Sequence, residues 1–220
     1  MEPLRITFDM GTPVIVPDTP IHLDGLLSWA RVDEGTAGDE GAEPWSVQHD
    51  LPLEKFFTSS AWCFKASWLT FTWAGEPRAF HLSRRSDPVE FANAYVSGVL
   101  GKRKPSWNAA SGPTKGYSIL GQERLAVRAE AFAVGDADRI SVLLSRVICL
   151  GKHHRLGKGL IRSFRVESVF HDACPWHRRH LPDDTEIARE GTVRAPGALS
   201  APYWEKLCQT IVRIPIDAAF

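Results

Sequence analysis

The sequence contains no long apolar run, and this absence limits where the protein can work. None of its 220 residues belongs to a segment near the ~20 consecutive apolar residues that cross a bilayer. The N-terminal stretch MEPLRITFDM is acidic and alternates like a strand, whereas a signal peptide combines a basic start with an apolar centre. We therefore expect a cytoplasmic protein without a membrane partner.

Cysteine is scarce, and its spacing excludes two kinds of small domain. The four cysteines are widely separated and form no C-x-x-C pair, so neither a disulfide framework nor a zinc ribbon is indicated. The motifs G-x-S-x-G and H-E-x-x-H are absent, and so is a paired-carboxylate motif. We expect reduced thiols, no metal and no other cofactor.

The net charge is zero, but acidic and basic residues are unevenly distributed along the chain. The 26 Lys and Arg residues balance 26 Asp and Glu residues. Residues 1–61 carry 11 acids and 3 bases, whereas residues 62–220 carry 15 acids and 23 bases. Binding responds to local potential rather than to net charge, so the second part can still attract a polyanion.

Hydrophobic periodicity predicts an α+β fold. Apolar residues with helical spacing, expected to form buried faces, are Leu23, Leu26, Leu27 and Ala30, and Ile140, Leu143, Leu144, Val147 and Ile148. Those that alternate as in a strand are Leu125, Val127, Ala129, Ala131 and Ala133. We expect strands at 4–10, 61–73, 79–83, 123–134, 161–170 and 209–216, and helices at 21–34, 87–100 and 136–148. The strand at 79–83 is expected to pair with 61–73 across the turn AGEP. The first half contains strand, helix and strand, and the second half contains strand, helix and strand. Together they predict a β-α-β-β-α-β core, the ferredoxin-like arrangement that also underlies RNA-recognition modules. Residues 1–170 would form this RNA-binding core, with an inserted basic loop near 99–120, and residues 171–220 an extension packed on it.

The first candidate site is a basic, glycine-rich loop between the last predicted helix and strand of the core. The stretch from Arg139 to Val166 holds seven Lys or Arg residues and no acid. Glycines let the backbone approach a ligand, and successive N–H groups in such turns bind anions. The spacing is not that of a Walker loop. A solvated turn is the alternative interpretation. The candidate RNA contacts are Lys152, His153, His154, Arg155, Gly157, Lys158, Gly159 and Arg162.

The second candidate site is the long loop at 101–118, in which cations alternate with aromatic rings. This pattern suits single-stranded nucleic acid, because phosphates meet the charges while bases stack on the rings. A solvated loop has a similar composition. The candidate residues are Lys102, Arg103, Lys104, Trp107, Lys115 and Tyr117.

The histidines raise two further hypotheses. His171, Cys174, His177 and His180 are spaced at threes, and zinc accepts such donors, but the spacing matches no familiar zinc module. His153 and His154 have the chemistry of a general base and acid for metal-free RNA cleavage. His22 and Asp24, at the entry to the first helix, are interpreted as a helix-start pairing.

Two segments resemble a known family. The opening PLRITFDMGTPVIVPDTPIHLDGLLSWA, with its core PIHLDGLL, and the later GKHHRLGKGLIRSFRVE are similar to the RAMP-superfamily subunit of type IV CRISPR effector complexes that occupies the crRNA 5′-handle end. The resemblance implies a ferredoxin-like core that binds the 5′ handle, caps a filament of backbone subunits and contacts the large subunit. Target DNA would be met only indirectly. Gly157, Lys158 and Gly159 match the loop expected to approach RNA.

The same resemblance implies a non-catalytic subunit of an antiviral ribonucleoprotein complex, because maturation in type IV systems is left to a separate endoribonuclease. In some other CRISPR types a related subunit cleaves the RNA. A metal-independent crRNA-processing endoribonuclease that uses His153 or His154 is therefore the alternative. The acidic stretch at 33–50 is expected to be an exposed loop, which either faces a basic neighbour or is solvated.

Overall fold

The computed structural model divides the chain into two compact units, Met1–Glu76 with Arg124–Phe220, and Pro77–Glu123. Within the parts of the chain that are described, no helix combines the length and the apolar character that a membrane crossing requires. The described residues are 1–15, 19–36, 47–85, 87–98, 115–187 and 190–216.

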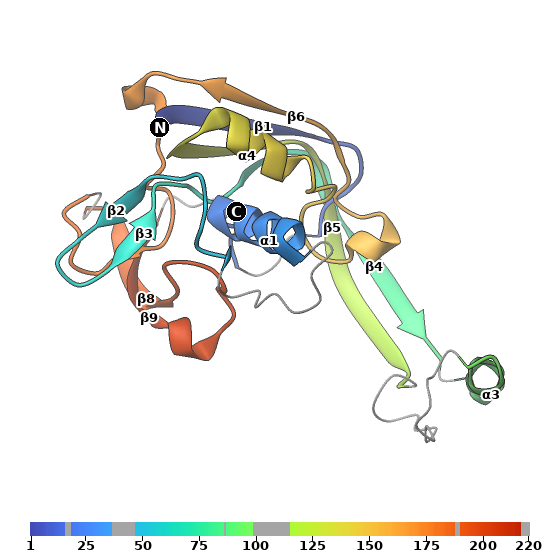
Figure 1. Cartoon of the computed structure of the whole chain (residues 1–220). Helices are drawn as coiled ribbons and strands as arrows, with labels where there is room; N and C mark the ends of the chain where they lie inside the picture. The colour runs from blue at the N-terminus through green and yellow to red at the C-terminus, as the bar shows by residue number, and fades with distance from the viewer. Residues whose placement is uncertain (16–18, 37–46, 86, 99–114, 188–189, 217–220) are drawn as a thin grey trace. The chain divides into compact units, whose positions relative to one another are not determined.

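Helices and strands are interspersed along the chain (Figure 1). The strands are β1 (Glu2–Met10), β2 (Lys55–Phe57), β3 (Trp62–Phe64), β4 (Thr70–Arg84), β5 (Tyr117–Gly135), β6 (Ile161–Ser168), β7 (Leu181–Pro182), β8 (Thr192–Gly197) and β9 (Thr210–Pro215). The α-helices are α1 (Leu23–Thr36), α3 (Pro88–Val96) and α4 (Ala137–Leu144), and the 3₁₀ helices are η2 (His154–Leu156), η3 (His171–Ala173) and η4 (Lys206–Cys208). This mixture of helices with mainly antiparallel strands confirms the α+β class.

The main sheet has the strand order β4-β5-β1-β6. The strand β1 pairs antiparallel with both β5 and β6, so that Ile6 lies opposite Ala131 on one side and Val166 on the other. Leu4, Ile6 and Phe8 are fully buried, because alternate side chains of a strand point to the same face. They share one core with apolar residues of α1 and α4, which pack against each other.

Both core helices follow the predicted apolar spacing. In α4 the carboxylate of Asp136 accepts a hydrogen bond from the Arg139 amide at 3.0 Å, which caps the helix. Ile140 and Leu143 are fully buried, but Ile148, the last residue of the predicted stripe, lies beyond the helix and is 66% exposed. The helix α1 extends to Thr36, so the acidic stretch begins as helix rather than as the predicted loop. Residues 37–46 of that stretch lie outside the described residues.

The predicted strand at 61–73 was wrong as a single element. The strand β3 pairs with β2, and the chain then leaves the hairpin, because the amides of Ser67, Trp68 and Leu69 bond to three other segments. The strand β4 starts only at Thr70 and runs through the predicted AGEP turn to Arg84. Its neighbour in the sheet is β5, so the expected pairing between 79–83 and 61–73 does not form.

The alternation of burial in β5 shifts by one residue within the strand. Ala126 and Ala129 are both buried, whereas Leu125 and Val127 are 47% and 55% exposed, although a regular alternation placed them in the core. An irregularity of this kind is how a strand accommodates one extra residue. A second difference concerns β6, which ends at Ser168, so that Phe170 lies beyond the strand and is 89% exposed.

The C-terminal part forms a three-stranded sheet in the order β7-β9-β8. The strand β9 confirms the strand predicted at 209–216, and it pairs antiparallel with both neighbours. A second buried cluster includes Cys63, Trp176 and Leu181, so this part packs on the β2–β3 hairpin. All four cysteines are free thiols.

In the unit Pro77–Glu123, the helix α3 begins as predicted and ends earlier. Its cap is Asp87, whose Oδ1 accepts a hydrogen bond from the Val89 amide at 2.8 Å. The helix ends at Val96, and none of its residues is buried. Within the same unit, the imidazole of His81 and the hydroxyl of Ser118 form a hydrogen bond of 2.8 Å between β4 and β5.

Candidate nucleic-acid interface

The glycine-rich loop that follows α4 is held against the segment that follows β1. The Gly159 amide donates to the Pro13 carbonyl and the Lys152 amide to the Ile15 carbonyl, both at 2.8 Å. The hydroxyl of Thr12 accepts a third bond from the Leu160 amide at 2.9 Å. The two sequence segments that carry the family resemblance therefore fold together, and the loop has a defined position at the start of β6.

The glycines of this loop have different roles. A Cβ atom at Gly151 would lie 2.6 Å from the Ile15 carbonyl oxygen, and one at Gly159 would lie 1.8 Å from the Leu150 carbonyl oxygen. Both glycines thus allow close approach to the chain's own backbone rather than to a ligand. At Gly157 the space is open to 4 Å, although its φ of +73° also favours glycine.

The loop also contains a histidine in an uncommon conformation. His153 has a φ of +60° and a ψ of 34°, the left-handed helical region, which few residues other than glycine adopt. The next residues form the 3₁₀ helix η2, and its Arg155 is exposed. Strained backbone of this kind is held by its surroundings and is concentrated at functional positions.

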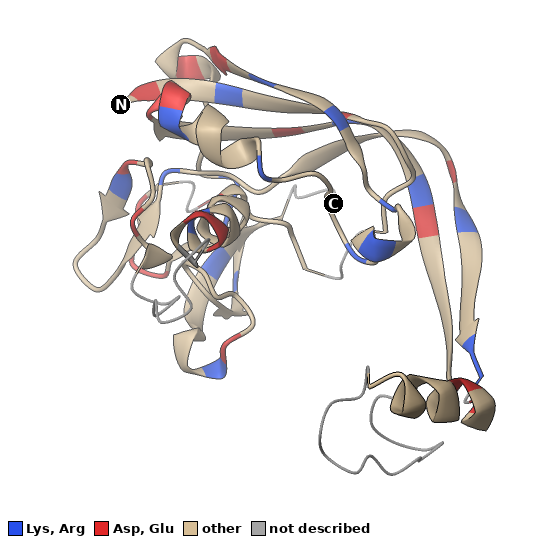
Figure 2. Cartoon of the chain, turned by 45° about the vertical axis from the view of Figure 1, so that its right-hand side comes forward, with Lys and Arg blue, Asp and Glu red and all other residues tan. Residues whose placement is uncertain are grey.

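Lys and Arg residues recur along the loop and β6 (Figure 2), but their environments differ. On α4 and at its C-terminal end, Arg139 and Arg146 bond to acids of α1, with an Nη–Oδ distance of 2.6 Å for the Arg146–Asp33 pair. Part of the acidic N-terminal segment is thus neutralised within the chain. Arg155 and Arg162, in contrast, form no salt bridge with any residue that the structure describes, and both are exposed.

The open face of the main sheet, away from α1 and α4, has a different character. Arg5 of β1 bonds to Glu167 of β6 at 3.1 Å. Asp9 of β1 lies 4.0 Å from Arg128 and 3.7 Å from Arg165. RNA-recognition modules present stacking aromatic residues on this face, whereas here oppositely charged side chains pair across the strands. In this region, Arg155 of the loop and Arg162 at the start of β6 are thus the exposed bases that no described acid neutralises.

Most residues of the second candidate site, the loop at 101–118, lie outside the described residues. Of its described residues, Lys115 is exposed, and Tyr117 is 39% exposed at the start of β5. These residues belong to the unit Pro77–Glu123. The predicted contacts outside the described residues are Lys102, Arg103, Lys104 and Trp107.

The four residues of the zinc hypothesis have separate environments. His171 is exposed, the thiol of Cys174 donates to the Ala133 carbonyl at 3.4 Å, and His180 bonds to the Ala198 carbonyl at 3.0 Å. Burial raises the pKa of Cys174, which disfavours the thiolate that binds metals. No group of three or more His, Cys, Asp or Glu side chains suited to a metal occurs among the described residues.

A buried ionic network near the start of α1 was not predicted. The guanidinium of Arg179 is fully buried and donates to the carbonyls of Phe64 and Ala66 at 2.7 and 3.0 Å. It also lies 3.4 Å from Asp24, whose carboxylate accepts a hydrogen bond of 2.8 Å from Tyr203. Asp24 therefore bonds to distant partners, and the helix-start pairing with His22 was wrong. Burial by itself lowers the pKa of Arg179, but the Asp24 charge raises it above its usual value.

His22 lies next to this network without a polar partner. Its ring stacks on Tyr203, with centroids 4.1 Å apart, and it is 4% exposed. Within the described residues, neither ring nitrogen forms a hydrogen bond, a state that costs about 1–3 kcal/mol for a buried polar group. Burial lowers the pKa of His22 well below its ordinary value, and His180 and Arg179 lower it further. The sequence signal that points to this cluster is the PIHLDGLL segment.

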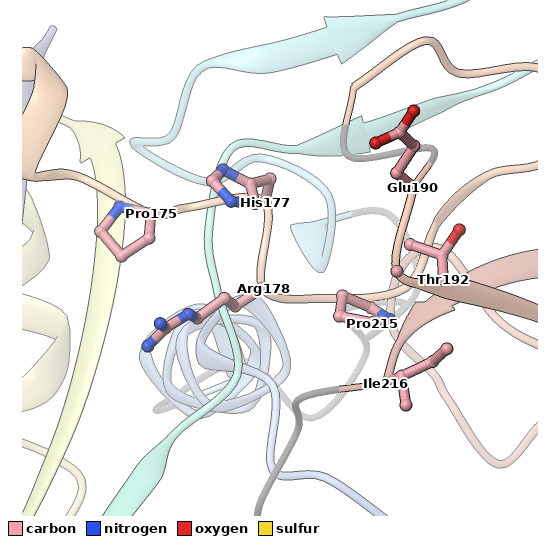
Figure 3. A pocket seen from close by; sticks show the side chains of 8 residues that line it. Pro175, His177, Arg178, Glu190, Thr192, Pro215 and Ile216 are labelled. Atoms are coloured by element: carbon pink, nitrogen blue, oxygen red, sulfur yellow. The ribbon is translucent and has the colours of Figure 1, made fainter.

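A cavity of about 570 Å³ lies near the ends of β8 and β9 (Figure 3). Its lining mixes Arg178 and His177 with Glu190 and apolar residues such as Ile216. Figure 3 shows the side chains of Arg178 and Glu190 well apart, and no ion pair joins them. Its polar side chains do not point toward one common ligand group, so the cavity is a weaker candidate for the functional site than the basic loop.

These features describe an α+β protein with a defined basic loop at the edge of an antiparallel sheet. Residues 2–215 match the family model described as CRISPR type IV associated protein Csf3, and the chain belongs to this family. None of the curated proteins compared with the chain matches it. Association with type IV CRISPR systems, the part of the resemblance that the family match covers, is thereby confirmed.

Proposed function

We propose that this chain is a non-catalytic subunit of a type IV CRISPR effector complex, which binds the 5′ handle of the crRNA and caps the filament of backbone subunits. Membership of the type IV family supports a place among CRISPR proteins. One observation supports the RNA contact most strongly. Arg155 and Arg162 are exposed and unneutralised by described residues, while the bases of α4 are paired with acids.

The proposed core is a ferredoxin-like RAMP fold at residues 1–170, with 171–220 as an extension packed on it. The order β4-β5-β1-β6 supports this proposal, because a β-α-β-β-α-β chain with α1 after the first strand and α4 after the third produces the same order. In this fold RNA would contact the loop before the last core strand. The paired charges on the open sheet face support the loop, rather than the sheet, as the RNA contact.

The proposed RNA contacts are made mainly to phosphates. Guanidinium groups bind phosphate oxygens strongly and in a fixed geometry. Lys152, Lys158 and the two histidines of the loop would lie along the same path, with Gly157 as the open backbone position. Such contacts fix the position of an RNA without reading its sequence.

Partner subunits are proposed to cover part of the unit Pro77–Glu123. This unit exposes large apolar side chains, among them Val96 at 86% and Leu120 at 77%, and α3 has no buried residue. Large apolar side chains with this degree of exposure are the kind of surface that a protein partner covers. The backbone and large subunits of the complex are the proposed neighbours, and target DNA would be met only through them. The basic loop near 99–120 is proposed as a further RNA contact.

The test of this function is a comparison of two charge-matched double variants. Arg155→Gln with Arg162→Gln should weaken binding of labelled repeat RNA at least about tenfold, because each charged hydrogen bond contributes about 1.5–3 kcal/mol. The control, Arg5→Gln with Arg128→Gln, removes the same charge from the open sheet face and should change affinity much less. Equal losses in both variants would contradict a specific role for the loop. The assay uses the full chain, alone and assembled with its complex partners.

The endoribonuclease alternative is decided in the same samples. We expect the bound RNA to remain intact on a denaturing gel, with or without divalent metal. A product that ends in a 2′,3′-cyclic phosphate, and that disappears in His153→Ala with His154→Ala, would overturn the non-catalytic assignment.

A further inference from the structure

A second cavity, distinct from the basic loop, lies at the start of α1. Its volume is about 370 Å³, within the range of pockets that hold small molecules, roughly 300–1,000 Å³. All of its lining residues belong to the unit Met1–Glu76 with Arg124–Phe220. They are Thr19, Pro20, His22, His180, Pro196, Gly197, Ala198, Tyr203, Trp204 and Gln209.

The neutral imidazole of His180 provides a hydrogen-bonding group at the wall of this cavity. Because the Ala198 carbonyl can only accept, Nδ1 of His180 must carry the proton of the 3.0 Å bond between them. Burial lowers the pKa of His180, so the ring is neutral and its Nε2 is an acceptor. His22 also lines the cavity, but its two ring nitrogens are buried and have no hydrogen-bond partner among the described residues. Its ring lies edge-on to His180, with centroids 4.7 Å apart.

Gly197 allows His180 to take this position. A Cβ atom at Gly197 would lie 3.0 Å from Nδ1 of His180, closer than nearly all real contacts, so any larger residue would displace the imidazole. The fold therefore leaves space for a polar ring at the side of the cavity.

The remaining walls are flat and uncharged. Tyr203 stacks on His22, two prolines contribute further apolar surface, and Trp204 is 73% exposed. None of the lining residues is Lys, Arg, Asp or Glu. Arg179, behind Tyr203, is fully buried and bonded to Asp24 and to backbone carbonyls. The lining therefore does not suit a phosphate, but suits an uncharged planar ring with hydrogen-bonding groups on its edge.

We propose that this cavity binds one unpaired nucleobase, which stacks on Trp204 and presents its polar edge to Nε2 of His180. Unpaired bases are bound in this manner, by stacking on aromatic rings and by hydrogen bonds to their edges. The choice of a nucleobase among planar heterocycles rests on the proposed RNA-binding function. The base belongs either to the bound RNA or to a free nucleoside, and the two sources are separated by experiment.

The first arm of the test uses free nucleosides and the full chain. Adenosine, guanosine, cytidine and uridine are titrated separately, with tryptophan fluorescence and saturation-transfer NMR as the readouts. At least one nucleoside should bind, and Trp204→Ala should weaken its binding about tenfold through loss of one stacking platform. The matched control is Trp29→Ala, which removes another exposed tryptophan that does not line this cavity and should leave binding unchanged.

The second arm uses repeat RNA with one abasic position at a time. A single abasic position should reduce RNA affinity as much as Trp204→Ala does. The two changes combined should reduce affinity no more than either change alone. That result identifies the base as part of the RNA. Nucleoside binding without any sensitive position identifies a free nucleoside instead. Trp204→Ala should leave the salt dependence of RNA binding unchanged, in contrast to the arginine variants of the loop, so failure of the two proposals can be distinguished.

A histidine variant provides an independent readout. His180→Phe removes the acceptor Nε2 and should weaken nucleoside binding. His22→Phe keeps the ring that stacks on Tyr203 and removes two buried, unsatisfied nitrogens, so it should maintain or raise the melting temperature and leave nucleoside binding unchanged. The proposal is overturned if no nucleoside binds the wild-type chain and Trp204→Ala leaves RNA affinity unchanged. It is also overturned if Trp204→Ala impairs only assembly with protein partners, since the surface would then be a protein-docking site.

Discussion

The buried guanidinium of Arg179 joins segments that lie far apart in the chain. It donates to carbonyls beside β3 and lies 3.4 Å from Asp24 of α1, which also bonds to Tyr203 of the C-terminal part. Sequence periodicity identified Leu23 and Leu27 as core residues, but it gave no indication that Asp24 has a partner 155 positions away. A long-range ionic contact leaves no local spacing pattern, so it could not be predicted from one sequence.

Replacement of Arg179 tests how far the geometry of this network matters. Arg179→Lys keeps the charge but loses the planar donor set that bonds to Phe64, Ala66 and Leu199. We expect a decrease of at least about 2 kcal/mol in the free energy of unfolding, because each buried carbonyl left without its donor costs about 1–3 kcal/mol. Urea denaturation of the two proteins measures this difference. A loss below about 1 kcal/mol would show that charge alone suffices.

The neutral histidines predict an acid-sensitive stability. Burial lowers the folded-state pKa of His22 and of His180, so the unfolded chain binds protons that the folded chain does not. Stability is therefore fully present above the ordinary histidine pKa of about 6.5 and is lost as the pH falls below it, by up to about 1.4 kcal/mol per pH unit for each group. Denaturation at pH 7.5 and 5.5 should show this decrease. In His22→Phe it should be smaller, and an equal decrease would contradict the assignment.

At the scale of elements, the glycine-rich loop shows what sequence reasoning could and could not predict. Its basic character and its place between α4 and β6 follow from composition and periodicity. The role of its glycines could not be predicted in this way. Gly159 is needed because any side chain there would collide with the Leu150 carbonyl, and not because a ligand approaches. The interruption of the predicted strand at 61–73 also results from long-range contacts of the backbone. The backbone bonds of Ser67 to Leu69 to distant segments overrode a favourable local β-propensity.

Two alanine variants separate structure from ligand contact within this loop. Gly159→Ala places a Cβ atom 1.8 Å from the Leu150 carbonyl oxygen at a φ of +68°, so we expect a stability loss of about 3 kcal/mol or more. Gly157→Ala meets no atom within 4 Å and should lose only about 1 kcal/mol, from its left-handed conformation. Thermal unfolding of both variants measures the contrast. Gly157→Asn is the control, since asparagine tolerates this conformation, and equal losses at both sites would refute the assigned roles.

At the scale of the whole chain, the charge segregation has two separate outcomes. Asp33 and Glu34 of the acidic N-terminal part pair with Arg146 and Arg139. These two acids therefore form contacts within the chain rather than with a neighbouring subunit. The basic charge at Arg155 and Arg162 has no such partner among the described residues. Counts of charge by segment predicted the separation, but only the structure distinguishes the paired bases from the unpaired ones.

The most direct test of RNA binding by the loop is the salt dependence of affinity for repeat RNA. Each phosphate contact made to a single strand adds about 0.7 to the slope of log K against log salt concentration. Replacing Arg155 and Arg162 with glutamine should therefore reduce the slope by about 1.4, similarly for guides of different sequence, while the Arg5 and Arg128 control keeps the wild-type slope. An unchanged slope in the loop variant would contradict the account and remove this loop from the RNA-binding site.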